Sequence, residues 1–314
     1  MPQVALRAVR VAVEAAVLGS RAMNRWMTVL GAALALGGAA CGGAVQSGVA
    51  VGRVGHGLSA QARTAPQGAE VCTLQESLAA LPGTEKPMSE ACGKAARSDL
   101  LWRRSMAVLA AYGQTLETLA SGSGTDNAGR LEAAATGLRD ADSMPADGAA
   151  EQSARDGALA LVKQMSTGSA GGDLGRAIKD AAPHVKAICE GLTAYLETTA
   201  KGFADVERDA EKKRASRGDR RCGTASGVNV CVSESPIDRM VYGNVFAQAS
   251  LLESTHNETR ASVAGFCAAH RKAEQAAADG NLGKDQTYVD IVEAIKSAQH
   301  ASSDAKAGAK STKK

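Results

Sequence analysis

Two long stretches of helical periodicity, separated by a short segment bounded by cysteines, constrain this chain more than any other feature. From Gly172 to about Arg217, apolar residues recur at alternating spacings of three and four, and the pattern returns from Pro236 to about Ala278. Apolar residues at this spacing lie on one face of an α-helix. Because only a short segment joins the two stretches, we expect an antiparallel helical hairpin.

Helical periodicity also marks residues 91–120, 149–165 and 284–300, and Gly-, Ser- or Pro-rich breaks separate these runs. Aromatic residues make up 3% of the chain and alanine is abundant, which disfavours β-sandwiches and barrels. The sequence therefore predicts an all-α domain over residues 69–301, an antiparallel helical bundle that contains the long helical hairpin.

Residues 23–40 have the composition of a secretion signal. Arg25 provides a basic start, an apolar run follows from Trp26 to Leu36, and small residues lead to Cys41. This run is too short to cross a membrane as an ordinary helix, so we expect its removal during secretion. Residues 1–22 precede the signal and are interpreted as a mis-assigned upstream extension.

The four residues Gly38, Ala39, Ala40 and Cys41 resemble the lipobox of bacterial lipoproteins. That family usually has leucine where this chain has Gly38. The resemblance implies that a lipid modifies Cys41 and anchors the chain to the membrane. Because Gly42 rather than an acidic residue follows the cysteine, it also implies an outer-membrane address in the bacterial cell envelope, facing the periplasm.

An ordinary signal peptidase site is the alternative, since the small residues 37–40 also suit that enzyme. Cys41 would then be an unpaired thiol. The cysteine count favours lipidation, because the chain has seven cysteines and Cys41 is the odd one if the other six form disulfides.

Secretion makes disulfide bonds the expected state of the six remaining cysteines. Sequence order suggests two short loops, one from Cys72 to Cys92 and one from Cys222 to Cys231. No Cys-x-x-Cys pair is present, so the sequence gives little support to a zinc site or any other metal site.

The third pairing follows from the predicted hairpin. Cys189 and Cys267 lie almost equally far from its tip, near residue 226. Two antiparallel helices with the same rise per residue would bring these cysteines level with each other. We therefore expect a disulfide between them.

The segments on either side of the predicted bundle have no sustained helical period. Residues 41–68 are rich in Gly, Ala, Ser and Val, which is typical of a flexible tether, and a short strand near Val51 is the alternative. Residues 302–314 lack large apolar residues and contain several lysines. We expect this tail to be disordered.

Charge gives no support to a nucleic-acid partner. The full chain has 36 basic and 33 acidic residues, but residues 1–40 hold four arginines and one glutamate. The chain from Cys41 onward therefore has no net formal charge, and its one basic concentration is the short C-terminal tail.

Motifs for catalysis are also missing from the sequence. There is no Gly-x-Ser-x-Gly elbow, phosphate-binding Gly-Lys-Ser/Thr loop or His-Glu-x-x-His helix. His256 and His270 would lie roughly 21 Å apart on one helix, too far to share a metal ion. We expect neither a cofactor nor an enzymatic activity.

These observations favour an envelope-anchored scaffold, adaptor or protein-interaction module without catalytic activity, with the membrane and an envelope protein as partners. The alternative is a periplasmic bundle that binds a small ligand or cofactor. In that case polar residues near the predicted helix contacts could line a cavity, namely Thr199, Gln248, Thr255 and Thr259.

Overall fold

The computed structural model describes residues 43–64, 68–79, 89–121, 148–166, 173–215, 220–225, 228–233 and 236–311, together with residues 133 and 136. Side chains are described over these ranges except at 63–64, 166, 215–239 and 302–311. The predicted extension and signal, residues 1–40, lie outside the described residues.

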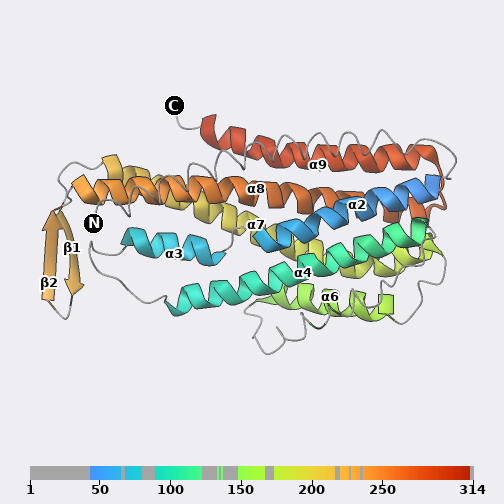
Figure 1. Cartoon of the computed structure of the whole chain (residues 1–314), viewed down its shortest axis with the longest axis horizontal. Coiled ribbons are helices and arrows are strands. Elements are labelled where there is room, and N and C mark those ends of the chain that lie inside the picture. The colour runs from blue at the N-terminus through green and yellow to red at the C-terminus, as the bar shows by residue number, and fades with distance from the viewer. Residues whose placement is uncertain are drawn as a thin grey trace, which may run out of the picture. The chain divides into compact units, whose positions relative to one another are not determined.

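Seven α-helices and one β-hairpin make up this part of the chain (Figure 1). They are α2 (Gly43–Thr64), α3 (Gly68–Ala79), α4 (Glu90–Ser121), α6 (Ala149–Ser166), α7 (Leu174–Ala215), β1 (Arg220–Ala225), β2 (Val228–Ser233), α8 (Pro236–Ala278) and α9 (Asp285–Ser311). The predicted all-α helical bundle is confirmed, with the short β-hairpin as an addition.

The long helical hairpin consists of α7 and α8, which pack along each other. Strands β1 and β2 join them as an antiparallel pair, in which Cys222 and Cys231 are opposite residues. Pro236 is the first residue of α8, the position where proline costs no helical hydrogen bond. The sequence-based prediction of this hairpin is confirmed, although the strands were not predicted.

Among the described residues, two hydrophobic cores hold the helices together. The larger core receives buried side chains from every described helix except α3, and its largest members include Tyr112, Phe266 and Leu109. The smaller core lies between α3 and the part of the α7–α8 hairpin nearest the β-hairpin. Its buried members are Val71, Leu74, Leu78, Phe203, Val206, Ala210, Tyr242, Val245 and Ala249.

The prediction of a flexible tether over residues 41–68 is wrong for residues 43–64. Residues Gly43–Thr64 form α2, and Val51 and Leu58 of this helix are fully buried in the larger core. Helix α2 packs along α4 and also contacts α8 and α9. The folded body therefore begins at Gly43 rather than near residue 69.

Glycines misled the sequence interpretation of α2, because they serve close packing there. A Cβ atom on Gly52 would lie 2.7 Å from the carbonyl oxygen of Gly113 on α4, and one on Gly55 would lie 2.9 Å from the Cα atom of Gly113. These distances are shorter than van der Waals contact, so only glycine lets the two backbones approach this closely.

The last helix is longer than predicted. Helix α9 runs to Ser311, so the expectation of a disordered tail is wrong for residues 302–311. Alanine and lysine have high helix propensity, which lets the helix continue from its packed part without large apolar residues. Gly280, with φ of 69°, ends α8, and the Asn281 amide donates to the Ala276 carbonyl at 2.7 Å.

Candidate functional site

Two of the predicted site cysteines join α3 to α4. Cys72 and Cys92 form a disulfide with a Cα–Cα distance of 5.4 Å, as sequence order suggested. The Glu76 carboxylate lies close enough to both sulfurs to complete a set of three potential metal ligands. Because the sulfurs are bonded to each other, they are not thiolates, and this disulfide form does not offer a metal the sulfur ligands it needs.

A second disulfide joins the middle of α7 to α8. Cys189 and Cys267 are bonded, with a Cα–Cα distance of 5.9 Å and a sequence separation of 78. This is the pairing predicted from the register of the hairpin. It fixes the two longest helices against each other inside the larger core, where Cys189 is buried.

The remaining predicted cysteines have a different status. Cys222 and Cys231 face each other as Cα partners in the β-hairpin, but their side chains lie outside the described residues. Cys41, the predicted lipidation site, also lies outside them. Since α2 begins at Gly43, only Gly42 separates Cys41 from the first residue of the folded body.

Asp99 of α4 is buried, and its side chain has three hydrogen-bond partners. Its carboxylate accepts hydrogen bonds from the backbone amides of Gly68 and Ala69, each at 2.9 Å, and from the hydroxyl of Tyr195 on α7. The two amides belong to the first turn of α3, whose N–H groups have no acceptor within the helix. Asp99 therefore fixes the N-terminus of α3 to α4 and α7.

Burial raises the pKa of Asp99 above its usual value, while its hydrogen bonds from Tyr195 and the α3 amides lower it in part. Burial also raises the pKa of Tyr195, and the adjacent Asp99 adds to this effect. The Tyr195 ring stacks on Trp102 with centroids 5.4 Å apart. Both polar groups thus have their bonding capacity used inside the protein, which is the arrangement of a structural clamp rather than an exposed acid–base pair.

A second buried polar pair joins α4 to α8. The Tyr112 hydroxyl lies 2.9 Å from Nε2 of His270, and both side chains are buried in the larger core. Burial lowers the pKa of His270 to about 4, so the ring is neutral at physiological pH. A neutral imidazole with one nitrogen hydrogen-bonded to tyrosine connects the two helices without placing a charge in the core.

His256, the other histidine considered as a metal ligand, is also buried. Its Nε2 atom lies 2.7 Å from the carbonyl oxygen of Leu196 on α7, and its ring packs against Phe203. His256 therefore bridges α8 and α7, as His270 bridges α8 and α4. The structure does not bring the two histidines together.

The four polar residues considered as a ligand lining do not surround one cavity. Thr199 and Thr255 donate to backbone carbonyls one turn earlier in their own helices, at 3.1 and 3.5 Å. Thr259 Oγ1 lies 3.1 Å from Oε1 of Gln61 on α2, and Gln248 is exposed. These side chains mainly satisfy local hydrogen bonds and join α8 to α2.

A hollow of about 770 Å³ lies where α2, α4, α7 and the α8–α9 turn meet. The four polar residues Thr199, Gln248, Thr255 and Thr259 do not line it. Most of its lining is apolar or glycine, and its charged members are Asp173, Arg176 and Lys179. Asp173 Oδ1 accepts a hydrogen bond from the Arg176 amide at 3.2 Å, and the Arg176 side chain pairs with Asp180 at 3.6 Å. The hollow therefore offers mainly apolar surface.

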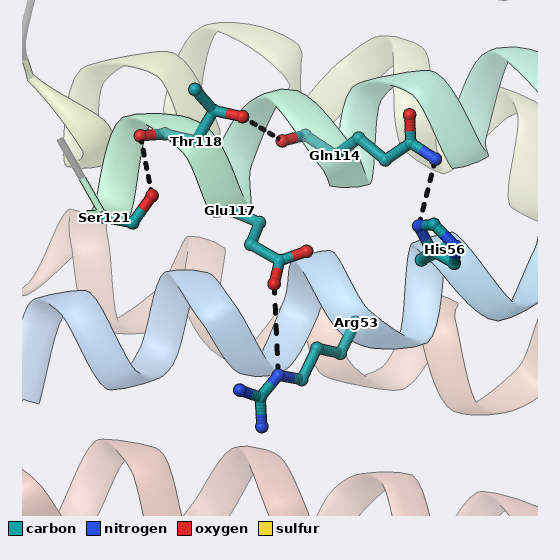
Figure 2. Close-up of polar contacts among 6 residues, drawn as sticks. All are labelled: Arg53, His56, Gln114, Glu117, Thr118 and Ser121. Atoms are coloured by element: carbon teal, nitrogen blue, oxygen red, sulfur yellow. Dashed lines mark hydrogen bonds and ion pairs between the residues drawn. The ribbon is translucent and has the colours of Figure 1, made fainter. Parts of the chain in front are cut away.

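Polar side chains border the close contact of α2 with α4 (Figure 2). Arg53 Nε lies 3.9 Å from Glu117 Oε1, and Gln114 Nε2 lies 3.0 Å from His56 Nδ1. Both pairs are at the surface, where such interactions contribute about 0–1 kcal/mol. They mark the edge of a helix contact and do not enclose a binding site.

Sequence reasoning missed the buried polar groups Asp99 and Tyr112–His270. A signal for both was present in the helical spacing. Asp99 precedes Trp102 by three positions and Met106 by seven, and His270 follows Phe266 by four, so each falls on a buried face of its helix. The partners could not be found this way, because Tyr195 and Tyr112 come from distant parts of the chain.

Comparison of the chain with protein-family models, with curated proteins and with solved structures found no match in any of the three. Within the described ranges, no helix combines the length and apolar character that spanning a membrane requires.

Proposed function

We propose that the chain is an envelope lipoprotein, anchored through Cys41, whose helical body acts as a non-catalytic scaffold or protein-interaction module. The observation that carries this proposal is the pair of disulfides between helices, Cys72–Cys92 and Cys189–Cys267. In bacteria such bonds persist outside the cytoplasm. Their presence in a chain whose odd cysteine ends a secretion-like segment supports export followed by lipidation.

The placement of α2 supports a body held close to the membrane. Only Gly42 lies between Cys41 and the start of α2 at Gly43. Two residues of extended chain span about 7 Å. In this account the anchored end of the helical body lies at the lipid headgroups, not tens of ångströms away on a flexible tether.

A structural role is supported by how the buried titratable groups are used. Asp99 binds the first turn of α3, His270 binds Tyr112, and His256 binds a backbone carbonyl of α7. Each group connects two or more helices. The chemistry of the described core is therefore directed at holding helices in fixed positions, as a scaffold requires.

Metabolic labelling with a fatty-acid analogue in a bacterial host tests the anchor. The Cys41→Ser variant should lose the label and move from the membrane to the soluble fraction, whereas Gln46→Ser, a nearby polar change in α2, should keep both. Equal labelling of Cys41→Ser and the unsubstituted chain would contradict lipidation at this residue.

The hollow beside α2 supports a second candidate, binding of a small apolar ligand. Apolar side chains of Val45, Leu119, Leu174 and Leu282 line it. Mass spectrometry of the protein from its host, under native and then denaturing conditions, separates the two proposals. An added mass that disappears on denaturation would support the ligand, and a stoichiometric protein partner would support the scaffold.

A further inference from the structure

One face of α8 is exposed and carries no charge. The chain has no charged residue from Met240 to Leu252, although 22% of all residues are charged. Met240 is 70% exposed, Val241 46% and Leu251 64%, and Asn244, Ala247 and Gln248 are also exposed. We call this face, defined by these six exposed residues, the α8 strip. A charge-free exposed helix face with large apolar side chains is typical of a contact surface.

The interior does not use this strip. Tyr242, Val245 and Ala249 of the same helix segment are buried in the smaller core with residues of α3 and α7. With about 100° between successive residues, these three lie on the side of α8 opposite Met240 and Leu251. The described elements thus cover one side of this segment and leave the strip at the surface.

Farther along α8, the same face is covered by α9. A Cβ atom on Gly265 would lie 3.6 Å from Ile295 and from Gln299, and Gly265 follows Leu251 by about four helical turns. Helix α9 ends at Ser311, and Figure 1 shows that α8 continues beyond this end toward the β-hairpin. The α8 strip therefore continues an established helix–helix interface past the point where α9 stops.

Two pairs of strip residues are arranged symmetrically about one point. Met240 and Leu251 have the same midpoint in sequence as Asn244 and Ala247. If two α8 helices cross antiparallel at this midpoint, Met240 of each copy meets Leu251 of the other, so the large apolar side chains pack together. Each Asn244 then lies opposite Ala247, whose small side chain leaves room for the amide.

The same register sets Gln248 opposite Gly243. Apart from its chain neighbours and the backbone of its own helix, no described atom lies within 4 Å of a Cβ atom placed on Gly243, so the surface there is open to a longer side chain. Met240 and Leu251 thus meet each other across the two copies, Val241 meets Ser250, and each amide meets a small residue. A two-fold interface requires this kind of self-complementary surface.

We propose that the α8 strip pairs with the α8 strip of a second copy of the chain, in an antiparallel two-fold dimer. The absence of charge within the strip means that the two strips meet without like-charge repulsion. A steep crossing, of the common class near −50°, limits the length over which a second helix runs beside α8 and α9. The strip has six exposed residues, against about 20–30 on each side of a standard interface, so we expect a weak and transient dimer. It does not depend on the lipid anchor.

Sedimentation velocity on the full-length chain in detergent micelles, over a range of concentrations, tests the dimer with two charged variants. Met240→Glu/Leu251→Glu places only carboxylates across the interface and should weaken association at least about tenfold. Met240→Glu/Leu251→Lys should retain the dimer, because the antiparallel register brings Glu opposite Lys. Gln275→Glu, an exposed site elsewhere on α8, is the control for added charge and should not change association.

A monomer at every concentration for the unsubstituted chain would overturn the proposal. Dimerisation of Met240→Glu/Leu251→Glu as strong as that of the unsubstituted chain would place the contact on another surface. Equal loss in the Glu/Glu and Glu/Lys variants would overturn the antiparallel register. Circular dichroism shows whether each variant is folded, which we expect because both substituted side chains are exposed.

Photo-crosslinking in the host cell tests the same contact near its centre. A benzophenone amino acid in place of Gln248, whose counterpart Gly243 leaves room for it, should give a covalent dimer whose crosslinked peptides both come from α8. The same group at Glu190, an exposed residue of α7, should not. Crosslinks from position 248 to a different envelope protein, with none between copies, would show that the strip serves another partner and would overturn the proposal.

Discussion

Gly55 of α2 and Gly113 of α4 are in backbone contact: a methyl group on Gly113 would lie 2.9 Å from the Cα atom of Gly55. The same methyl group would lie 3.2 Å from the carbonyl oxygen of Gly52. Both neighbours are backbone atoms, which cannot rotate away as a side chain could. This contact lets α2 pack in the larger core. Helix α2 is the described helix that follows the predicted anchor in sequence.

Gly113→Ala should therefore destabilise the protein, measured by chemical denaturation. Overpacking costs about 1–3 kcal/mol, against a gain of about 1 kcal/mol when alanine replaces a helical glycine. Gly57→Ala is the matched control, since no described atom lies within 4 Å of its added Cβ atom. This control should raise the free energy of unfolding. A Gly113→Ala variant as stable as Gly57→Ala would contradict the close contact.

Loss of the Asp99 hydrogen bonds should lower the stability of the whole protein and also loosen α3 locally. Asp99→Asn keeps the size of the side chain but removes the charge and one acceptor oxygen, so one of its three donors loses its partner. We expect the free energy of unfolding to fall by about 1–3 kcal/mol. Amide hydrogen exchange in α3 should accelerate more than exchange in α6, which the clamp does not touch.

Asp209→Asn is the control for Asp99→Asn. Asp209 is exposed on α7 and lies 4.0 Å from Lys212, so its loss should change stability by less than about 0.5 kcal/mol. If both variants showed the same small change, Asp99 would not be fixing α3.

The buried His270 predicts a loss of stability in acid. Its pKa in the folded protein is about 4, below its value of 6.5 in the unfolded chain. Between these values the unfolded chain binds a proton that the folded protein does not, so stability falls as pH drops from 6.5 to about 4. The full shift corresponds to about 3 kcal/mol.

Urea denaturation at several pH values measures this effect. His270→Gln retains a hydrogen-bonding group for Tyr112. Its free energy of unfolding should decline less between pH 6.5 and 4 than that of the unsubstituted chain. His184→Gln, on a less buried part of α7, should follow the unsubstituted chain. If the free energy of unfolding fell equally with pH in all three proteins, His270 would not be held neutral by the core.

The two described disulfides should contribute different amounts to the free energy of unfolding. On the chain-entropy model, the loop closed by Cys189–Cys267 contributes about 4.5 kcal/mol and the shorter one closed by Cys72–Cys92 about 3 kcal/mol. Paired Cys→Ala replacements, one bond at a time, measure this by denaturant unfolding. A larger loss for the short loop would contradict the ranking and indicate that packing of α3 dominates.

Apolar periodicity was enough to predict most of the fold. The long runs of α4, α7 and α8 carry large apolar residues at helical spacing, and α8 begins at Pro236 as expected. The same spacing located the Cys189–Cys267 bond, because two antiparallel helices share one rise per residue. Regular geometry over many residues makes such predictions accurate.

Helix α2 could not be predicted in the same way. Its glycines lower intrinsic helix propensity, and sequence alone does not show that Gly113 comes to lie against Gly55. The candidate site shows the same limit. Asp99 and Tyr195 are far apart in the chain, so their hydrogen bond follows only from the tertiary structure. Contacts between distant residues were the part that composition and spacing left open.

Intact mass spectrometry of the protein from its native envelope, with alkylation of free thiols, tests the lipid anchor and the disulfide bonds in one measurement. We predict a chain that begins at Cys41, carries added acyl mass and contains no alkylated cysteine. A chain that retains residues 1–22 and takes up alkylating reagent at several cysteines would contradict both the anchor and the disulfide-stapled body.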